Sequence, residues 1–208
     1  MESKRKDKTV KSNARQDEIV AAALRLLEET GLEGITLRKL AEHLHMQAPS
    51  LYWYFKDKRT LIDFMAEKIL QKEFSDFGKI SDDEDWKVWL TTTMLRLRRA
   101  MLSYRDGASV VAGAHLGPAK TLAQIIAYSC ESLYKSGLSI EDAQTVVMTA
   151  LHFTFGRVIE EQESPTEREA KKFLHESIFE KYPYLNQRSS EGMNIDKEFR
   201  RSLELIIR

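Results

Sequence analysis

The chain has 208 residues, which is enough for one or two domains, and its 32 basic side chains equal its 32 acidic ones. A neutral total excludes a protein that is basic over its whole surface, although it leaves room for a local basic patch. Hydrophobic residues make up 42% of the chain, which excludes wholesale disorder. The single cysteine, Cys130, excludes an internal disulfide and a four-cysteine metal site and is typical of a reducing compartment.

Residue types that interrupt helices are scarce, since the chain has 9 glycines and 4 prolines. No stretch shows the alternation of a strand, so we expect an all-α protein. The longest uncharged stretches, such as residues 143–156, are shorter than the ~20 apolar residues that cross a bilayer. The N-terminus is basic and polar with no apolar segment behind it, so we expect no signal peptide and a cytoplasmic location.

Residues 1–14 are predicted to form a basic, flexible arm, which is either a solvated tail or a segment that contacts an anion. A first helix is expected from about residue 15 to residue 30, where Gly31 can adopt the positive φ that ends a helix. The apolar side chains of this helix recur at spacings of three and four, which predicts one buried face. They are Ile19, Ala22, Ala23, Leu26 and Leu27.

Two short helices follow the first one. Thr36 can cap the second helix, and His45 and Met46 form a turn behind it. Pro49 opens the third helix, because a proline in the first helical position loses no hydrogen bond. We therefore predict a small three-helix domain over residues 15–61 and a second helical domain over residues 62–208.

The second domain reads as a series of helices. Asp57 caps a helix with Leu61 on its apolar face, and the next helix starts at 82–84 and runs to about residue 104. Glycines at 107, 113 and 117 interrupt the chain before a helix over 118–136. Capping-box spacings at Ser139–Asp142 and Thr166–Glu169 open further helices, the first ending at Pro165. A loop is expected at 183–194, and the last helix places Ile195, Phe199, Leu203 and Ile206 on one side.

The segment 36–59 has the pattern of a helix-turn-helix, whose second helix enters the major groove of DNA. It holds five basic residues and two acidic ones in a chain that is neutral overall. The alternative is an ordinary three-helix core with a solvated basic face. DNA contact is favoured because four consecutive aromatic residues, 52–55, cannot all point into one small core.

The run from Gly34 to Leu61, GITLRKLAEHLHMQAPSLYWYFKDKRTL, resembles the DNA-binding signature of the tetracycline repressor (TetR) family. Residues 104–108 (YRDGA), 115–117 (HLG) and 152–162 (HFTFGRVIEEQ) resemble the C-terminal domain of the tetracycline repressor subgroup. The resemblance covers most of residues 15–165. It implies a homodimeric, ligand-responsive repressor that binds a palindromic operator in double-stranded DNA.

The resemblance also assigns roles in DNA binding. Arg38, with Lys39 beside it, reads a base edge, and residues Gln47, Ala48, Pro49 and Ser50 face the groove. The side chains that hold the DNA backbone are Tyr52, Trp53, Tyr54 and Lys58. Ala48 departs from the family, because the tetracycline repressors carry a base-reading amide at this position. The operator is therefore expected to differ from theirs.

The effector is expected to be a drug-sized molecule that is more apolar than tetracycline. Phe74 stands at the family's ring-binding histidine, Thr93 and Leu97 replace an amide and an aromatic residue, and Ser129 replaces a glutamine. A site that loses several polar groups changes the class of ligand it accepts. The expected ligand contacts are Phe74, Thr93, Leu97, His115, Ile126, Ser129, Val147 and Leu151.

Two positions of the family's metal-associated residues are kept. His115 matches a metal-ligating histidine and Glu160 an acid that holds a metal-bound water, but residues 111–114 resemble an insertion directly before His115. The alternative is that His115 caps a turn and Glu160 is solvated or faces a dimer partner. One histidine and one carboxylate are too few for a protein-only Mg²⁺ site, so Mg²⁺ is expected only together with a chelating ligand, and no cofactor is required. His152 is expected to be a core histidine.

The resemblance implies a four-helix dimer bundle built from the helices near 140–163 and 195–208. The candidate dimer contacts are Val146, Met148, Leu203 and Ile207. An activator or adaptor with the same head remains an alternative. A hydrolytic or metal enzyme using His115, His152 and Glu160 is a further one, but the chain has no glycine-flanked serine nucleophile, no His-Glu-x-x-His motif and no phosphate loop, so we expect no enzyme.

Overall fold

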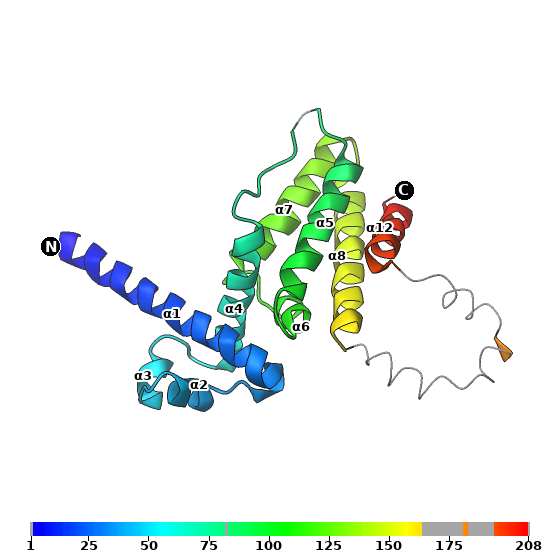
Figure 1. Cartoon of the computed structure of the whole chain (residues 1–208). Helices are drawn as coiled ribbons and strands as arrows, with labels where there is room; N and C mark the ends of the chain where they lie inside the picture. Colours follow the sequence, from blue (N-terminus) through cyan, green and yellow to red (C-terminus); the bar gives the residue numbers. More distant parts are fainter. Residues whose placement is uncertain (1, 82, 164–180, 183–193, 208) are drawn as a thin grey trace. The chain divides into compact units, whose positions relative to one another are not determined.

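The computed structural model describes residues 2–81, 83–163, 181–182 and 194–207, with backbone alone before residue 13. Regular secondary structure in these ranges is entirely α-helical, which confirms the all-α prediction (Figure 1). The chain divides into two compact units, Met1–Gln162 and Glu163–Arg208. The predicted boundary between residues 61 and 62 stays a prediction. Across the described ranges, no helix combines the length and apolarity that a bilayer crossing needs.

Three helices form the N-terminal head: α1 (Glu2–Gly34), α2 (Leu37–His43) and α3 (Ala48–Tyr52). Thr36 caps α2 by accepting a hydrogen bond from the Lys39 amide at 3.1 Å, as predicted. The predicted turn after α2 is present, with His45 at φ 52°. The core of the head is fully buried and consists of Ile19, Leu27, Ile35, Leu40 and Leu51.

The first helix starts thirteen residues earlier than the expected start at Arg15, because α1 begins at Glu2. Residues 2–14 are polar, and polarity led us to expect an arm. They contain no glycine or proline, and most are good helix formers, so nothing local separates them from the apolar stripe that follows. The C-terminal end of the first helix agrees better with the prediction, since Gly31 kinks the helix at φ 69°.

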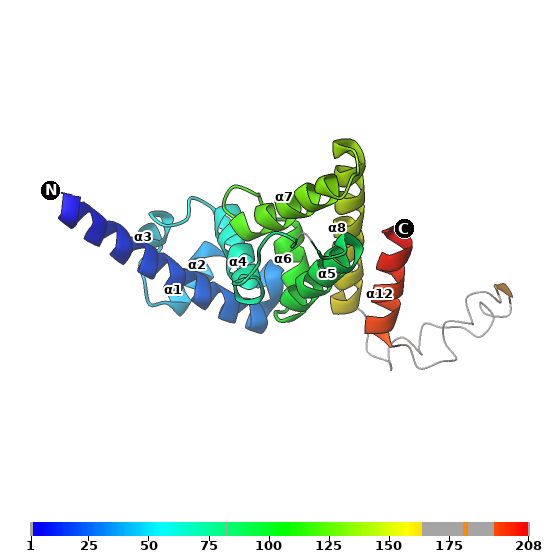
Figure 2. The same cartoon turned by 90° about the horizontal axis from the view of Figure 1, so that it is seen from above.

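Helix α4 (Lys58–Glu73) leads from the head into the remaining helices. It packs on α1 at one side and on α5 (Trp86–Leu102), α6 (Gly107–Ala112) and α7 (Lys120–Lys135) at the other. Leu61, Met65 and Ile69 form its fully buried face. Helices α5 and α7 lie side by side in both views (Figures 1 and 2).

Two helix starts in this part differ from the prediction. Helix α5 begins at Trp86, capped by Asp85, rather than at 82–84. Helix α6 begins on Gly107, which was expected to interrupt the chain. Asp106 takes the left-handed conformation (φ 53°), and a Cβ at Gly107 would lie 2.2 Å from the Met101 carbonyl oxygen. Glycine therefore permits the tight passage from α5 into α6 instead of breaking a helix.

Helix α8 (Ile140–Glu163) begins as its capping box predicts. The Asp142 amide donates to Ser139 Oγ at 3.0 Å, and the Ser139 hydroxyl donates to Asp142 Oδ2 at 2.7 Å. His152 is exposed, so its expected place in the core is wrong: apolar residues occur on several sides of α8, but the buried ones follow one stripe that includes Val147, Leu151 and Val158, and His152 lies outside it. Pro165, the capping box Thr166–Glu169 and residues 183–193 of the expected loop lie outside the described residues.

Helix α12 (Ile195–Ile206) is capped by Asn194, whose side chain accepts from the Lys197 amide at 3.0 Å. Phe199 and Leu203 are fully buried, in agreement with the predicted apolar side. Ile206 is half-buried and Ile195 is exposed, while Ile207 is buried instead. The apolar face is therefore rotated slightly from the one expected.

The cap of α4 generates a prediction about pH. Asp57 Oδ1 accepts from the Thr60 amide at 2.8 Å and from the Thr60 hydroxyl at 2.9 Å, and these bonds lower the pKa of Asp57. The cap stabilises the fold above the unfolded-state pKa and loses this effect as the carboxylate is protonated. We expect the difference in free energy of unfolding between wild type and Asp57→Asn to be largest near neutral pH and to shrink below about pH 4.

The measurement is urea denaturation monitored by circular dichroism across this pH range. The control is Asp83→Asn, since Asp83 is exposed and has no hydrogen-bond partner in the described part of the chain. A difference that grows as the pH falls would contradict the assigned cap.

Candidate nucleic-acid interface and ligand site

Helix α3 divides the four consecutive aromatic residues between two faces. Phe55 is fully buried together with Leu51, one turn before it. Tyr52 is 55% exposed and Trp53 is 89% exposed. Leu51, in α3, and Phe55, just after it, form a buried pair at a spacing of four residues. The exposed aromatic pair remains available to a partner.

Most side chains predicted to contact DNA lie on the surface of α2 and α3. Arg38 is 86% exposed and donates to Glu42 at 3.1 Å. An exposed ion pair is worth less than about 1 kcal/mol, so Arg38 is free to exchange Glu42 for another acceptor. Lys39, Gln47, Pro49 and Ser50 are also exposed, and Ala48 and Tyr54 are half-buried.

Lys58 has a partner that the sequence did not indicate. Its Nζ donates to the Leu32 carbonyl oxygen at 2.9 Å, at the junction between α1 and α2. A phosphate contact from Lys58 would require this bond to break. Lys56, which lies two residues before the first residue of α4, is exposed.

Two carboxylates on α4 bind the connection between α6 and α7. Asp63 is 3% exposed and accepts from the His115 amide at 2.9 Å, while His115 Nδ1 lies 3.0 Å from its other oxygen. Glu67, one turn later, accepts from the Thr121 amide at 2.8 Å and from the Thr121 hydroxyl at 3.0 Å. Sequence analysis missed both acids; the available signal was a spacing of four among apolar residues of a helix.

A second connection joins the turn between α5 and α6 to the end of α1. Asp106 Oδ2 accepts from the Leu32 amide at 2.7 Å, and the Arg105 amide donates to Glu28 Oε1 at 2.8 Å. Gly31 lies against this turn, where a Cβ would be 3.0 Å from Asp106 Oδ2. The head is thus held both by α4 and by the start of α6.

The residues predicted to hold a metal are not arranged as a cation site. The His115 side chain is 64% exposed, and Arg59 Nε lies 3.3 Å from its Nδ1, which places a cation where a metal would bind. Glu160 is 73% exposed and lies 3.6 Å from Arg157. Within the described ranges, no three His, Cys, Asp or Glu side chains gather around a common point. These donors do not fit a protein-only Mg²⁺ site.

Six of the eight predicted ligand contacts are buried. Leu97, Ser129 and Val147 have no exposed surface, and Leu151, Thr93 and Phe74 are 2%, 3% and 5% exposed. Ile126 is half-buried, and His115 is exposed. Ser129 Oγ is the one buried side-chain nitrogen or oxygen without a hydrogen-bond partner among the described residues. A buried hydroxyl of this kind calls for an explanation, and a bound molecule is one.

An aromatic cluster that the sequence did not indicate joins α4, α5 and α7. Phe77 stacks on Trp89 and on Tyr128, with ring centroids 5.5 Å and 5.9 Å apart, and meets Phe74 edge-on at 5.2 Å. The Arg96 guanidinium lies 4.9 Å from the centroid of Phe74. Tyr128 precedes Ser129, so the unpaired hydroxyl and the cluster occupy neighbouring positions on α7.

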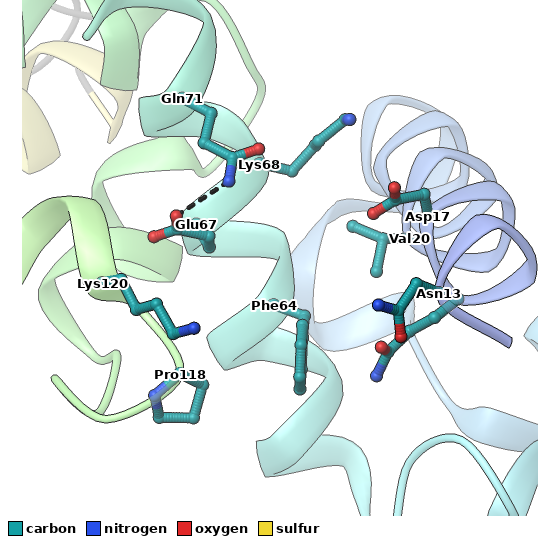
Figure 3. A pocket seen from close by; sticks show the side chains of 10 residues that line it. Asn13, Asp17, Val20, Phe64, Glu67, Lys68, Gln71, Pro118 and Lys120 are labelled. Atoms are coloured by element: carbon teal, nitrogen blue, oxygen red, sulfur yellow. Dashed lines mark hydrogen bonds between the residues drawn. The ribbon is translucent and has the colours of Figure 1, made fainter. Parts of the chain in front are cut away.

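A pocket of about 360 Å³ opens between α1, α4 and the start of α7 (Figure 3). Its walls come from residues 13–20, residues 64–71 and residues 118–120. None of the eight predicted ligand contacts lines it. It is therefore distinct from Ser129 and the other predicted ligand contacts.

Cys130 is half-buried, and burial raises the pKa of its thiol. A raised thiol pKa leaves little thiolate at neutral pH, so Cys130 is a poor nucleophile.

A three-helix head with an exposed aromatic-tipped helix, attached to a larger helical core, defines a helix-turn-helix regulator. Residues 19–64 match the family model "Bacterial regulatory proteins, tetR family", and residues 81–208 match "Tetracyclin repressor-like, C-terminal domain". The chain belongs to the TetR family of transcriptional regulators. This family is one of regulators, not enzymes, which decides against the hydrolytic alternative.

The chain is similar to a curated relative and to solved structures over most of its length. It is 35% identical over 198 residues to the tetracycline repressor protein class C of Escherichia coli, covering 92% of this chain and 88% of the relative. The structure of TetR(class A) with 5a,6-anhydrotetracycline and magnesium is 33% identical, with a TM-score of 0.63, covering 91% and 94% of the two chains. BioQ with its double-stranded DNA operator is 26% identical, with a TM-score of 0.63, covering 74% and 92%.

The unpaired Ser129 hydroxyl leads to a prediction about stability. Removing a buried hydroxyl that lacks a partner relieves its desolvation cost, so Ser129→Ala is expected to raise the free energy of unfolding by about 1 kcal/mol without ligand. The matched control is Ser132→Ala on the same helix, because Ser132 is buried and donates to the Tyr128 carbonyl at 2.7 Å. Both changes gain the same helix propensity. Urea denaturation in which Ser129→Ala loses as much stability as Ser132→Ala would contradict the unpaired state.

Proposed function

We propose that this chain is a dimeric repressor that leaves a palindromic DNA operator when a small, largely apolar effector binds. The observation that carries the proposal is the exposed α3, whose aromatic residues 52 and 53 point outward while Leu51 and Phe55 fix it to the head. A helix of this kind beside a basic α2 suits the major groove. The operator complex of BioQ and the repressor name of the class C relative support this reading.

The residues proposed to bind DNA have two kinds of role, which are contact with the base edges and contact with the DNA backbone. Arg38 reads a base edge, because it is exposed and, within the described part of the chain, its side chain pairs with the exposed Glu42 alone. Residues 47–50 face the groove, and Lys39, Tyr52, Trp53 and Tyr54 contact the backbone. Lys58 joins them if it exchanges the Leu32 carbonyl for a phosphate oxygen.

The dimer is proposed to form through α8. Val146 and Met148 are half-buried and His152 is exposed, so this helix presents side chains that another chain can cover. Leu203 and Ile207 were predicted as dimer contacts, but 0% and 2% of their surface is exposed in a single chain, which leaves them little to offer a partner. Leu205, 54% exposed, is the better candidate on α12.

The effector is proposed to bind around Ser129 and the neighbouring aromatic rings. Phe74 stands where the tetracycline repressors carry a histidine, and Thr93 and Ser129 stand where they carry side-chain amides, which disfavours tetracycline. Ser129 and Thr93 are left as the polar groups that orient the ligand. Mg²⁺ is proposed to enter only with a chelating ligand, since His115 and Glu160 do not hold it alone. The site requires no resident cofactor, and we place the protein in the cytoplasm.

Control of DNA binding is proposed to pass through α4. Its two acids fix it to the α6–α7 connection, and its first residue is bonded to the α1–α2 junction. An effector that binds the protein more tightly when α4 is in one position than in another shifts the equilibrium between these two conformations. Coupling of this kind is typically worth ~1–3 kcal/mol.

The experiment that tests the proposal is a gel shift with DNA from directly upstream of the gene for this chain. We expect retardation by a dimer and half-sites separated by a helical turn of about 34–36 Å or a multiple of it. A reporter with and without the gene then establishes the sign of regulation. No shift with upstream DNA and a monomer in light scattering would together exclude the proposal.

Two substitutions distinguish base recognition by Arg38 from backbone contact by Lys58. Arg38→Ala is expected to cost ~1–3 kcal/mol of operator affinity and to relax specificity at one base pair. Lys58→Ala is expected to weaken binding to all sequences alike and to reduce the slope of log affinity against log salt by about 1. Lys72→Ala, an exposed lysine at the far end of α4, is the control. Equal effects of the first two changes on every sequence would exclude the assigned roles.

A titration tests the effector class. We expect tetracycline with magnesium to show no sub-micromolar binding, since Phe74, Thr93 and Ser129 replace the histidine and the amides of the tetracycline repressors. Intrinsic tryptophan fluorescence reports binding, because Trp89 stacks in the aromatic cluster beside the site. A saturable sub-micromolar signal that requires magnesium would show that the ligand class has not changed.

A further inference from the structure

The pocket between the head and the core has the size and position of a small-molecule site. Its volume of about 360 Å³ lies in the range of ~300–1,000 Å³ that ligand pockets occupy. Residues 13–20 belong to the head, whereas residues 64–71 and 118–120 belong to the core side of the molecule. Ligand sites occur preferentially at such junctions.

Two lysines in the pocket lack carboxylate partners. Lys68 on α4 and Lys120 at the start of α7 make no ion pair or hydrogen bond through their side chains within the described residues. Figure 3 shows Lys120 extending into the pocket toward Phe64, and Lys68 reaching from α4 toward α1. The two ammonium groups point in different directions, and one anionic group contacts both once the flexible Lys68 side chain turns toward Lys120.

The acids of the pocket are placed so that they leave these lysines free. Glu67 accepts from Thr121 through both oxygens and also from Gln71 at 2.9 Å, so its carboxylate is already used. Asp17 is exposed on α1, on the wall opposite Lys120 (Figure 3). On the walls formed by α4 and α7, the charged groups that can bind a ligand are therefore the two positive lysines.

An aromatic surface lies beside the lysines. The half-buried ring of Phe64 lines the pocket between α1 and α4, and Val20, 2% exposed, lies on the facing wall. Phe64 also meets the buried ring of Phe55 edge-on, with centroids 5.6 Å apart. A flat ring that enters the pocket therefore stacks on Phe64. Phe64 in turn contacts Phe55, one of the two residues that fix α3 to the head.

We propose that this pocket is a second ligand site, separate from the buried site around Ser129, and that it takes small aromatic carboxylates. The carboxylate lies between Lys68 and Lys120, and the ring lies against Phe64 and Val20. An occupant separates α1 from α4 and thereby changes how the head is held. Its effect on DNA binding rests on the proposed function, whereas the binding itself does not.

The experiment titrates 2-naphthoate into the full chain and detects binding by isothermal calorimetry and ligand-observed NMR. At about −0.3 kcal/mol per non-hydrogen atom, this probe is expected to bind with a Kd in the millimolar range or tighter. Lys68→Gln and Lys120→Gln are each expected to weaken binding about tenfold, because each removes one charge-assisted hydrogen bond. Lys72→Gln on the same helix is outside the pocket and should leave binding unchanged.

The neutral 2-naphthamide, which has the same shape, is the second control and should bind at least about tenfold more weakly. No saturable binding of 2-naphthoate at millimolar concentration, or binding that neither lysine variant weakens, would overturn the proposal. The latter result would place the probe in the buried site. Gel shifts without the probe test the proposed repressor function independently, so the two failures are distinguishable.

Discussion

The attachment of α4 to the connection between α6 and α7 is the constraint on which the rest of the structure depends. Asp63 is almost completely buried, and a buried carboxylate is costly unless hydrogen bonds and opposite charge compensate it. The His115 amide and ring, with Arg59 nearby, provide that compensation. Because His115 comes from a segment far along the chain, α4 cannot tilt without exchanging this partner. The position of the head is therefore linked to the conformation of the core.

The recognition helix is short for a physical reason. Five residues form no stable helix alone, since nucleation costs more than so few hydrogen bonds return. Leu51 and Phe55 supply the missing stability by packing into the head, which frees Tyr52 and Trp53 to remain exposed. The Lys58 bond to the Leu32 carbonyl then fixes the start of α4 to the end of α1. A small surface is thus presented rigidly although its own helix is marginal.

Local signals in the sequence predicted most of this fold, and contacts between distant segments were what they could not predict. The caps at Thr36, Asp57 and Ser139 depend on neighbours three residues away, so the sequence contains all the information they need. The pairing of Asp63 with His115 joins residues 52 positions apart, and no spacing rule indicates it. His152 was misplaced because α8 is apolar on several sides, which periodicity alone reads as one core face. The pocket was missed because three separate segments form it.

The two ligand sites that we propose involve different neighbours of the same helix, α4. The buried site around Ser129 adjoins α5 and α7, which contact α4 from the core. The pocket containing Lys68 and Lys120 is lined by α1, α4 and the start of α7. In the proposed mechanism, a ligand in either site changes the free energy of one position of α4 relative to another, and DNA affinity responds to the sum of the two effects. In this proposal, replacing the family's histidine and amides by Phe74, Thr93 and Ser129 changes which molecule is sensed, while the route through Asp63 and Glu67 to the head stays the same.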